Sequence, residues 1–269
     1  MQKSYILGGI VANFIFTGLL FGYIVQYKPT LSSGENTPLQ QSLIAAISNN
    51  RSAVVGVFSN QEMSYGTEDK QGKQTIQTQT QKYIGGSAFF IDTRGYLLTS
   101  KHVIQDASKK YSILLDDGRS FTVQKSWIDP DLDLAVLYIG QDSHQISFPV
   151  VNLVHNETIL PIGQIAFTIG TPFSQYTNTV SMGIVSANGR NLQLDGGINY
   201  TGLYQLDINT NPGNSGGPVL TLQGDVFGLV TAMASQNSHL GFALPISEKS
   251  ILAILANIKA NDSIQSSPK

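Results

Sequence analysis

The chain has 269 residues, a formal net charge of −2 and no cysteine. The lack of cysteine excludes disulfides and cysteine-ligated metal sites, and the near-neutral charge gives no basic footprint for nucleic acid. Hydrophobic residues make up 41% of the sequence, which is enough for a large buried core. The apolar segments are short, rich in Val, Ile, Phe and Tyr, and broken by Gly, Asn and Asp, which indicates an all-β body.

Segment 1–28 is predicted to be a membrane anchor. Residues 4–27 carry no charged side chain. As a helix they would span about 36 Å at about 1.5 Å per residue, against a bilayer core of about 30 Å. A cleaved signal peptide is the alternative, but the run ends in Tyr23–Lys28 without the small residues of a cleavage site. One lysine on each side of the run gives little information on orientation.

A polar tether, 29–36, is expected to join the anchor to a folded domain at 37–260. Thr37 and Pro38 have the pattern of a helix cap followed by a first helical residue, and the helix is predicted to run to Asn50.

Two polar segments are predicted to be long loops. The first, 60–82, is rich in Gln and Thr and has almost no aliphatic residues. The second, 188–200, contains a Gly-Gly pair and lies shortly before the serine segment described below. Both are candidates for regulating a nearby site, and plain solvated loops are the alternative.

Two segments provide a candidate base and a candidate acid. His102 follows a strand-like run, Tyr96–Leu98, and Asp133 stands at the entrance of an apolar strand, 134–139. Asp129 lies before a proline, which is typical of a turn residue. Taken alone, His102 could also be a hydrogen-bonded core histidine.

The most informative segment is 210–218, Thr-Asn-Pro-Gly-Asn-Ser-Gly-Gly-Pro, which places Ser215 in glycine-rich backbone. Glycine permits a tight turn with positive φ. Such a turn can expose the serine hydroxyl and aim the N–H groups of Gly213 and Ser215 at one point, as an oxyanion requires. The segment alone could be a hairpin turn. With His102 and Asp133 it predicts a base, an orienting acid and a nucleophile, in the chain order of chymotrypsin.

The C-terminal segment 246–260 has apolar residues at helical spacing and is predicted to be an amphipathic helix packed on the body. Residues 261–269 are predicted to form a polar tail.

Seven sequence blocks resemble, in order, those of the HtrA/Deg family of trypsin-like serine proteases, over roughly residues 40–258. The blocks are Gly86–Phe89, Thr99–Val103, Asp133–Val136, Ile169–Phe173, Val180–Ser186, Asn211–Pro218 and Gly241–Pro245. Two positions depart from the pattern: Ala88 stands where the family usually has glycine, and Ser100 where it often has asparagine.

The resemblance implies a chymotrypsin-like pair of six-stranded β-barrels with short flanking helices. It implies His102, Asp133 and Ser215 as the catalytic triad, Gly213 and Ser215 as the oxyanion hole, and neither cofactor nor metal. It also implies a pocket for the P1 side chain, formed by Asn209, Thr210, Val230, Thr231 and Ala232. Because this set contains no carboxylate, cleavage is expected after small or medium uncharged residues rather than after Lys or Arg.

The resemblance further implies an extracytoplasmic homotrimer acting on unfolded or regulatory polypeptides. Only residues 246–269 follow the last block, fewer than the roughly 80 to 100 that a PDZ domain needs, so a member without that domain is expected. Two other functions stay open: a catalytically idle chaperone or scaffold, and a structural membrane protein that organises partners. Labelling with a fluorophosphonate separates them from a protease, because only an activated serine reacts.

Overall fold

The computed structural model describes residues 36–68, 74–140, 147–156, 159–171, 178–193, 199–233 and 240–265. The predicted anchor and nearly all of the predicted tether lie outside these residues. In the described part of the chain, no helix combines the length and apolar character that crossing a membrane requires.

The first half of the described chain forms a curled antiparallel sheet with the order β5-β4-β1-β2-β3-β7-β6. Its strands are β1 (Val54–Glu68), β2 (Gln74–Asp92), β3 (Tyr96–Thr99), β4 (Tyr111–Leu114), β5 (Ser120–Thr122), β6 (Lys125–Ile128) and β7 (Ala135–Tyr138). Strands β5 and β6 are two parts of one bent segment. Between them the Val123 N–H donates to Tyr111 O at 2.9 Å and the Gln124 N–H donates to Tyr138 O at 2.8 Å. The bend therefore joins the two edges of the sheet, so its seven strands form a ring of six chain segments.

The second sheet has the order β12-β9-β10-β11-β14-β13-β8 and a further pairing between β12 and β13. Its strands are β8 (Asn152–Leu153), β9 (Ile165–Gly170), β10 (Thr179–Gln193), β11 (Asn199–Leu206), β12 (Pro218–Leu220), β13 (Asp225–Met233) and β14 (Gly241–Pro245). The pairing of β12 with β13 closes a ring of six strands, and β8 adds to β13 in parallel outside that ring. The described chain is thus mostly β, in two sheets that each curl into a closed ring.

Strands β2 and β3 of the first sheet are buried on both faces where they pack against the second sheet. Phe89 and Leu98 belong to a core shared by both sheets and the helices, whereas their neighbours Phe90 and Leu97 belong to the core of the first sheet. This alternation follows the period of two of a β-strand. A third core fills the second sheet and includes Phe227 and Leu206. Strands β2 and β3 therefore contribute side chains both to the core of their own sheet and to the core shared with the second sheet.

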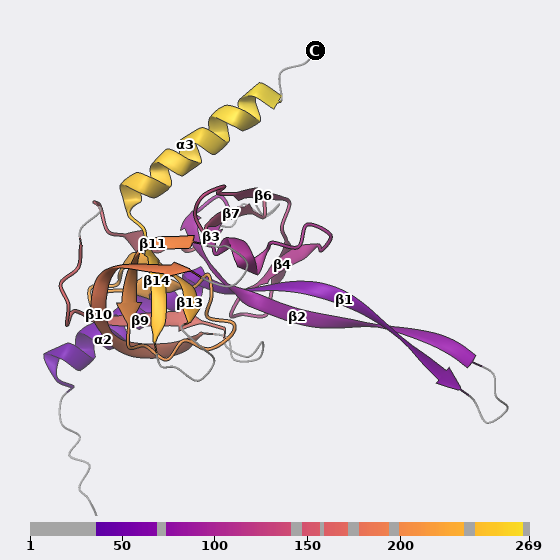
Figure 1. Cartoon of the computed structure of the whole chain (residues 1–269), viewed down its shortest axis with the longest axis horizontal. Helices are drawn as coiled ribbons and strands as arrows, with labels where there is room; N and C mark the ends of the chain where they lie inside the picture. The colour runs from indigo at the N-terminus through magenta and orange to yellow at the C-terminus, as the bar shows by residue number, and fades with distance from the viewer. Residues whose placement is uncertain are drawn as a thin grey trace, which may run out of the picture. The chain divides into compact units, whose positions relative to one another are not determined.

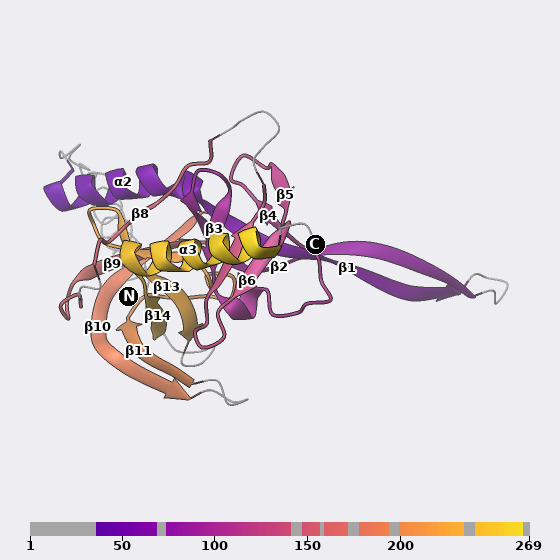
Figure 2. The ribbon, with the colours of Figure 1, turned by 90° about the horizontal axis from the view of Figure 1, so that it is seen from above.

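Segment 60–82 is mostly strand, so the prediction of a long loop there was wrong. Strands β1 and β2 pair from Val54 opposite Phe89 out to Glu68 opposite Gln74, with one register shift after Val57. The ribbon continues beyond the flanking strands β3 and β4 (Figures 1 and 2). A two-stranded ribbon satisfies its backbone groups across the pair and needs no aliphatic residues for that, so a polar composition did not distinguish it from a loop.

The prediction of a loop at 188–200 was also too long. Strand β10 continues to Gln193 and β11 begins at Asn199, and the two strands pair with register shifts between Val185 and Leu192. Polar and glycine residues in a strand are typical of such bulged, partly exposed pairing.

Two helices flank the sheets. Helix α2 (Pro38–Asn50) has the predicted bounds, and its last residue anchors it because Asn50 Nδ2 donates to Gly224 O at 3.1 Å. Helix α3 (Glu248–Gln265) begins behind a serine cap, in which the Ser250 N–H donates to Ser247 Oγ at 3.2 Å. It runs beyond the predicted end at 260, so residues 261–265 of the predicted tail are helical. Its buried apolar side chains include Ile251, Leu255 and Ile258.

Candidate active site

His102 lies on a short 3-10 helix, η2 (Lys101–Val103), that begins where β3 ends. Ser100 precedes this turn in an extended conformation, and its buried hydroxyl donates to Val230 O of the second sheet at 2.9 Å. The turn thus changes the direction of the backbone after β3 and places His102 where the first sheet meets the second. The histidine side chain is 31% exposed, so a substrate can reach it.

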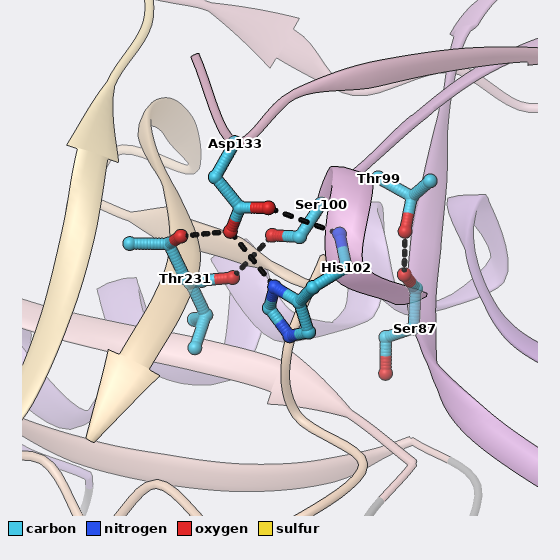
Figure 3. A network of polar contacts seen from close by, with 7 residues as sticks. Ser87, Thr99, Ser100, His102, Asp133 and Thr231 are labelled. Carbon is cyan, nitrogen blue, oxygen red and sulfur yellow. Dashed lines mark hydrogen bonds and ion pairs between the residues drawn. The ribbon is translucent and has the colours of Figure 1, made fainter. Parts of the chain in front are cut away.

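Asp133 lies just before β7 and accepts hydrogen bonds from three directions (Figure 3). The His102 N–H donates to Oδ1 at 3.0 Å, and His102 Nδ1 lies 2.8 Å from Oδ2. The Thr231 hydroxyl also donates to Oδ2. The carboxylate is only 4% exposed, so these donors replace water. They fix the carboxylate opposite one ring nitrogen of His102 and leave the other nitrogen unused by this pair.

The pKa of Asp133 lies below its usual value. Burial by itself would raise this pKa, but the hydrogen bonds and charge of His102, with the hydroxyl of Thr231, outweigh burial. A carboxyl group with a lowered pKa is ionised at neutral pH.

The neighbouring aspartate Asp129 has the turn role predicted for it. Its Oδ1 accepts the N–H groups of Asp131 at 2.9 Å and Leu132 at 2.8 Å. Lys101 Nζ donates to Asp129 O at 3.0 Å. The turn that begins at Asp129 thus places Asp133 beside the ring of His102.

Ser215 lies in a pair of consecutive tight turns. The Asn214 N–H donates to Asn211 O at 3.0 Å, and the Gly217 N–H donates to Asn214 O at 2.9 Å. Gly213 has φ +102° and Gly216 has φ +81°. A side chain at Gly216 would overlap Ser87 O. Glycine is therefore required there both by conformation and by space.

Among the hydrogen bonds of the described residues, none uses the N–H of Gly213 or of Ser215. These two groups are therefore available to a ligand atom. Within the same residues, no hydrogen bond joins Ser215 Oγ to His102. Bonds of this kind are often long in unliganded enzymes and tighten when substrate binds.

The residues predicted to form the P1 pocket differ in what they offer. Asn209 is exposed, whereas Thr210 is 3% exposed and its hydroxyl is buried without a hydrogen-bond partner. Val230 is buried, and its backbone is used by Gly216 and Gly217. The Thr231 hydroxyl is directed to Asp133, and Ala232 lies in β13 opposite Phe242.

Sequence reasoning missed the parts played by Thr231 and Ser100. Neither has a local signal, because each bonds to a residue roughly a hundred or more positions away. Tyr200, also unnoticed, has a raised pKa, first through burial and then through the charge of Asp133. No group of three or more His, Cys, Asp or Glu side chains in the described ranges could hold a metal ion.

Comparisons with known proteins point in one direction. The trypsin-like peptidase domain family matches residues 86–229. A probable periplasmic serine endoprotease, DegP-like, of Marinomonas sp. (strain MWYL1) is 34% identical over 194 residues, which cover 72% of this chain and 39% of the relative. The putative serine protease HhoA of Synechocystis sp. is 39% identical over 165 residues, covering 61% and 40%. The chain therefore spans about two fifths of the length of these curated relatives.

The solved structures include an HtrA-type protease, AlgW, with a decapeptide. It aligns with a TM-score of 0.67 at 31% identity and covers 81% of this chain and 67% of that chain. A second AlgW structure, with a tripeptide, aligns with a TM-score of 0.59 at 32% identity. Sequence and fold thus agree on the same group of proteins.

Proposed function

Because this chain belongs to the HtrA/Deg family of trypsin-like serine proteases, we propose that it is a serine endopeptidase that cleaves unfolded or regulatory polypeptides. The observation that carries the proposal is the bond between His102 Nδ1 and the buried carboxylate of Asp133. The turn at Ser215 supports it, because the N–H groups of Gly213 and Ser215 have no acceptor among the described residues. A base oriented by an acid, beside a serine with oxyanion donors, is the set that acyl transfer requires.

In the proposed reaction, Ser215 Oγ bonds to the carbonyl carbon of the scissile peptide while its proton passes to His102 Nε2. The carbonyl electron pair moves to oxygen, and the oxyanion accepts from the N–H groups of Gly213 and Ser215. The C–N bond then breaks as the leaving nitrogen takes the proton from His102, which gives the acyl-enzyme. Water repeats the sequence, releases the acid product and returns the proton to Ser215.

A fluorophosphonate probe tests the proposal directly. The wild-type chain should be labelled, and Ser215→Ala should not, because the probe reacts only with a serine activated by its base. A wild-type protein that stays unlabelled while binding unfolded polypeptide would instead favour the idle chaperone or scaffold.

We expect the P1 pocket to prefer residues that carry a hydroxyl. The Thr210 hydroxyl is buried without a partner, and a polar group in that state costs about 1–3 kcal/mol. Because the hydroxyl is buried, a P1 Ser or Thr must displace neighbouring atoms to bond it, and would then regain part of that cost. Cleavage after Ser or Thr should therefore exceed cleavage after Ala or Val by about tenfold, the equivalent of about 1.4 kcal/mol. A peptide library with varied P1 residues measures this ratio.

Thr210→Val should abolish that preference, since valine has the same shape but no hydroxyl. Thr221→Val is the matched control, because the Thr221 hydroxyl is likewise buried without a partner but belongs to none of the predicted site segments. Equal loss of preference in both variants, or a library profile dominated by Arg or Lys, would contradict the assignment of Thr210.

The remaining parts of the proposal concern location and assembly. A single-pass anchor at 1–28 with an extracytoplasmic protease domain at 37–260 is supported by the uncharged run 4–27 and by the periplasmic names of relatives. A homotrimer is supported by α2, where Leu39 and Ile44 are about half exposed. The full chain should stay in membranes after a carbonate wash, and a chain starting at Thr37 should sediment as a trimer. Release by carbonate, or a monomer at all concentrations, would contradict the respective part.

A further inference from the structure

Ser87 is a fully buried residue of β2 that ties the first sheet to the turn around Ser215. Its N–H donates to Ser215 O at 2.8 Å, and its hydroxyl donates to Gly213 O at 2.7 Å. The same hydroxyl accepts the Thr171 N–H at 2.9 Å, while Ser87 O accepts the Thr99 hydroxyl at 2.7 Å (Figure 3). Ser87 thus contacts the backbone on both sides of Asn214, from a strand more than a hundred residues away.

These contacts determine which way the turn presents its N–H groups. Gly213 has φ +102°, and glycine has no side chain to hold one backbone conformation against others. The bond from Ser87 Oγ fixes the carbonyl of Gly213. The N–H of the same peptide group belongs to Asn214, and it donates to Asn211 O. The peptide group between Gly213 and Asn214 is therefore held at both ends, and Ser87 holds its carbonyl end.

The hydroxyl itself has no freedom to turn away. It donates to Gly213 O and accepts from Thr171 N–H, so both roles are used. The fit is close, because a side chain at Gly86 would come within 2.7 Å of Ser215 O and one at Gly216 would overlap Ser87 O. The serine turn is therefore packed directly against β2.

We propose that Ser87 is a positioning residue for the oxyanion site: its hydroxyl holds Gly213 in the conformation in which the Gly213 and Ser215 N–H groups face one point. The proposal rests on the function proposed above. Ser87 touches no reacting atom and acts through Gly213. The Ser87 hydroxyl should affect the rate of acylation more than substrate binding, because the transition state needs both N–H groups and the bound substrate does not.

The test compares Ser87→Ala with the wild type, using a fluorogenic peptide and a peptidyl trifluoromethyl ketone with the same sequence. The ketone adds to an active serine and forms a tetrahedral oxyanion. Removing an oxyanion donor outright costs about 10²- to 10³-fold in kcat. Because alanine only releases the turn, we expect kcat to fall about 10- to 100-fold with KM within about twofold. The Ki of the ketone should rise by the same factor, and binding of the matching peptide amide should stay unchanged.

Thr168→Val is the matched control. It also removes one buried hydroxyl bond, from Thr168 Oγ1 to Pro218 O at 2.8 Å, but that bond ends on the first residue of β12 and does not contact Gly213 or Ser215. It should lower the melting temperature without raising the Ki of the ketone relative to the peptide amide. If Ser87→Ala does not fold, Ser87→Cys carries the same test, since a thiol is a weaker donor and should give an intermediate loss.

An unchanged Ki of the ketone in a folded Ser87 variant would overturn the proposal, whether kcat fell or not. So would an equal rise in the Thr168→Val control. A wild-type chain that neither hydrolyses the peptide nor binds the ketone more tightly than the peptide amide would instead contradict the proposed protease function.

Discussion

Replacing Ser215 or His102 by alanine is expected to lower turnover by about 10⁶-fold, and replacing both should lower it little further. The residues are proposed to act as a unit: without the base the hydroxyl stays a weak nucleophile, and without the hydroxyl the base has nothing to activate. The measurement is kcat on a fluorogenic peptide or on unfolded casein, with melting temperature recorded for each variant.

His155→Ala is the control for the histidine. His155 is highly exposed and paired with Glu248 at the start of α3, so its loss should leave turnover within about twofold. Retention of most activity by folded Ser215→Ala would show that another residue is the nucleophile. A much larger loss in the double variant than in either single variant would show that the two residues act independently.

Asp133→Asn is expected to lower turnover by about 10⁴-fold while leaving the protein folded. The carboxylate accepts from the His102 ring and from the Thr231 hydroxyl at the same oxygen. An amide has one oxygen and one NH₂ group, so it cannot accept in every position where the carboxylate does. The histidine would then hold the wrong tautomer, with its proton on the nitrogen that should receive the proton of Ser215.

The lowered pKa of Asp133 gives this variant a pH signature. A carboxyl group with a depressed pKa stabilises the folded state above its unfolded pKa, and that contribution is lost as pH falls through the folded pKa. The wild-type advantage in stability over Asp133→Asn should therefore be constant near neutrality and shrink in acid. Asp129→Asn, which keeps the turn acceptor, should change neither turnover nor this pH dependence. An equal loss of turnover in Asp129→Asn would contradict the choice of Asp133.

Elements with strong local signals were predicted well from sequence. Helix α2 begins at Pro38 because the cap and the proline favour that start, and α3 buries the apolar positions that recur at helical spacing. Segment 60–82 was predicted wrongly, because pairing between β1 and β2 stabilises a polar strand that composition alone assigns to a loop. The true end of α3 at Gln265 was missed for a similar reason, since polar residues end no helix by themselves.

The sequence by itself determined the candidates for chemistry. The glycines around Ser215, the position of His102 after a strand and the aspartate before β7 are local features, readable without a fold. Only the tertiary structure decided which distant groups complete the site. Thr231 reaches Asp133 and Ser87 reaches Gly213 because the two sheets pack against each other and bring together segments that are far apart in the chain. Such contacts depend on strand register and on the packing of the two sheets. Neither can be predicted from a single serine or threonine in the sequence of a strand.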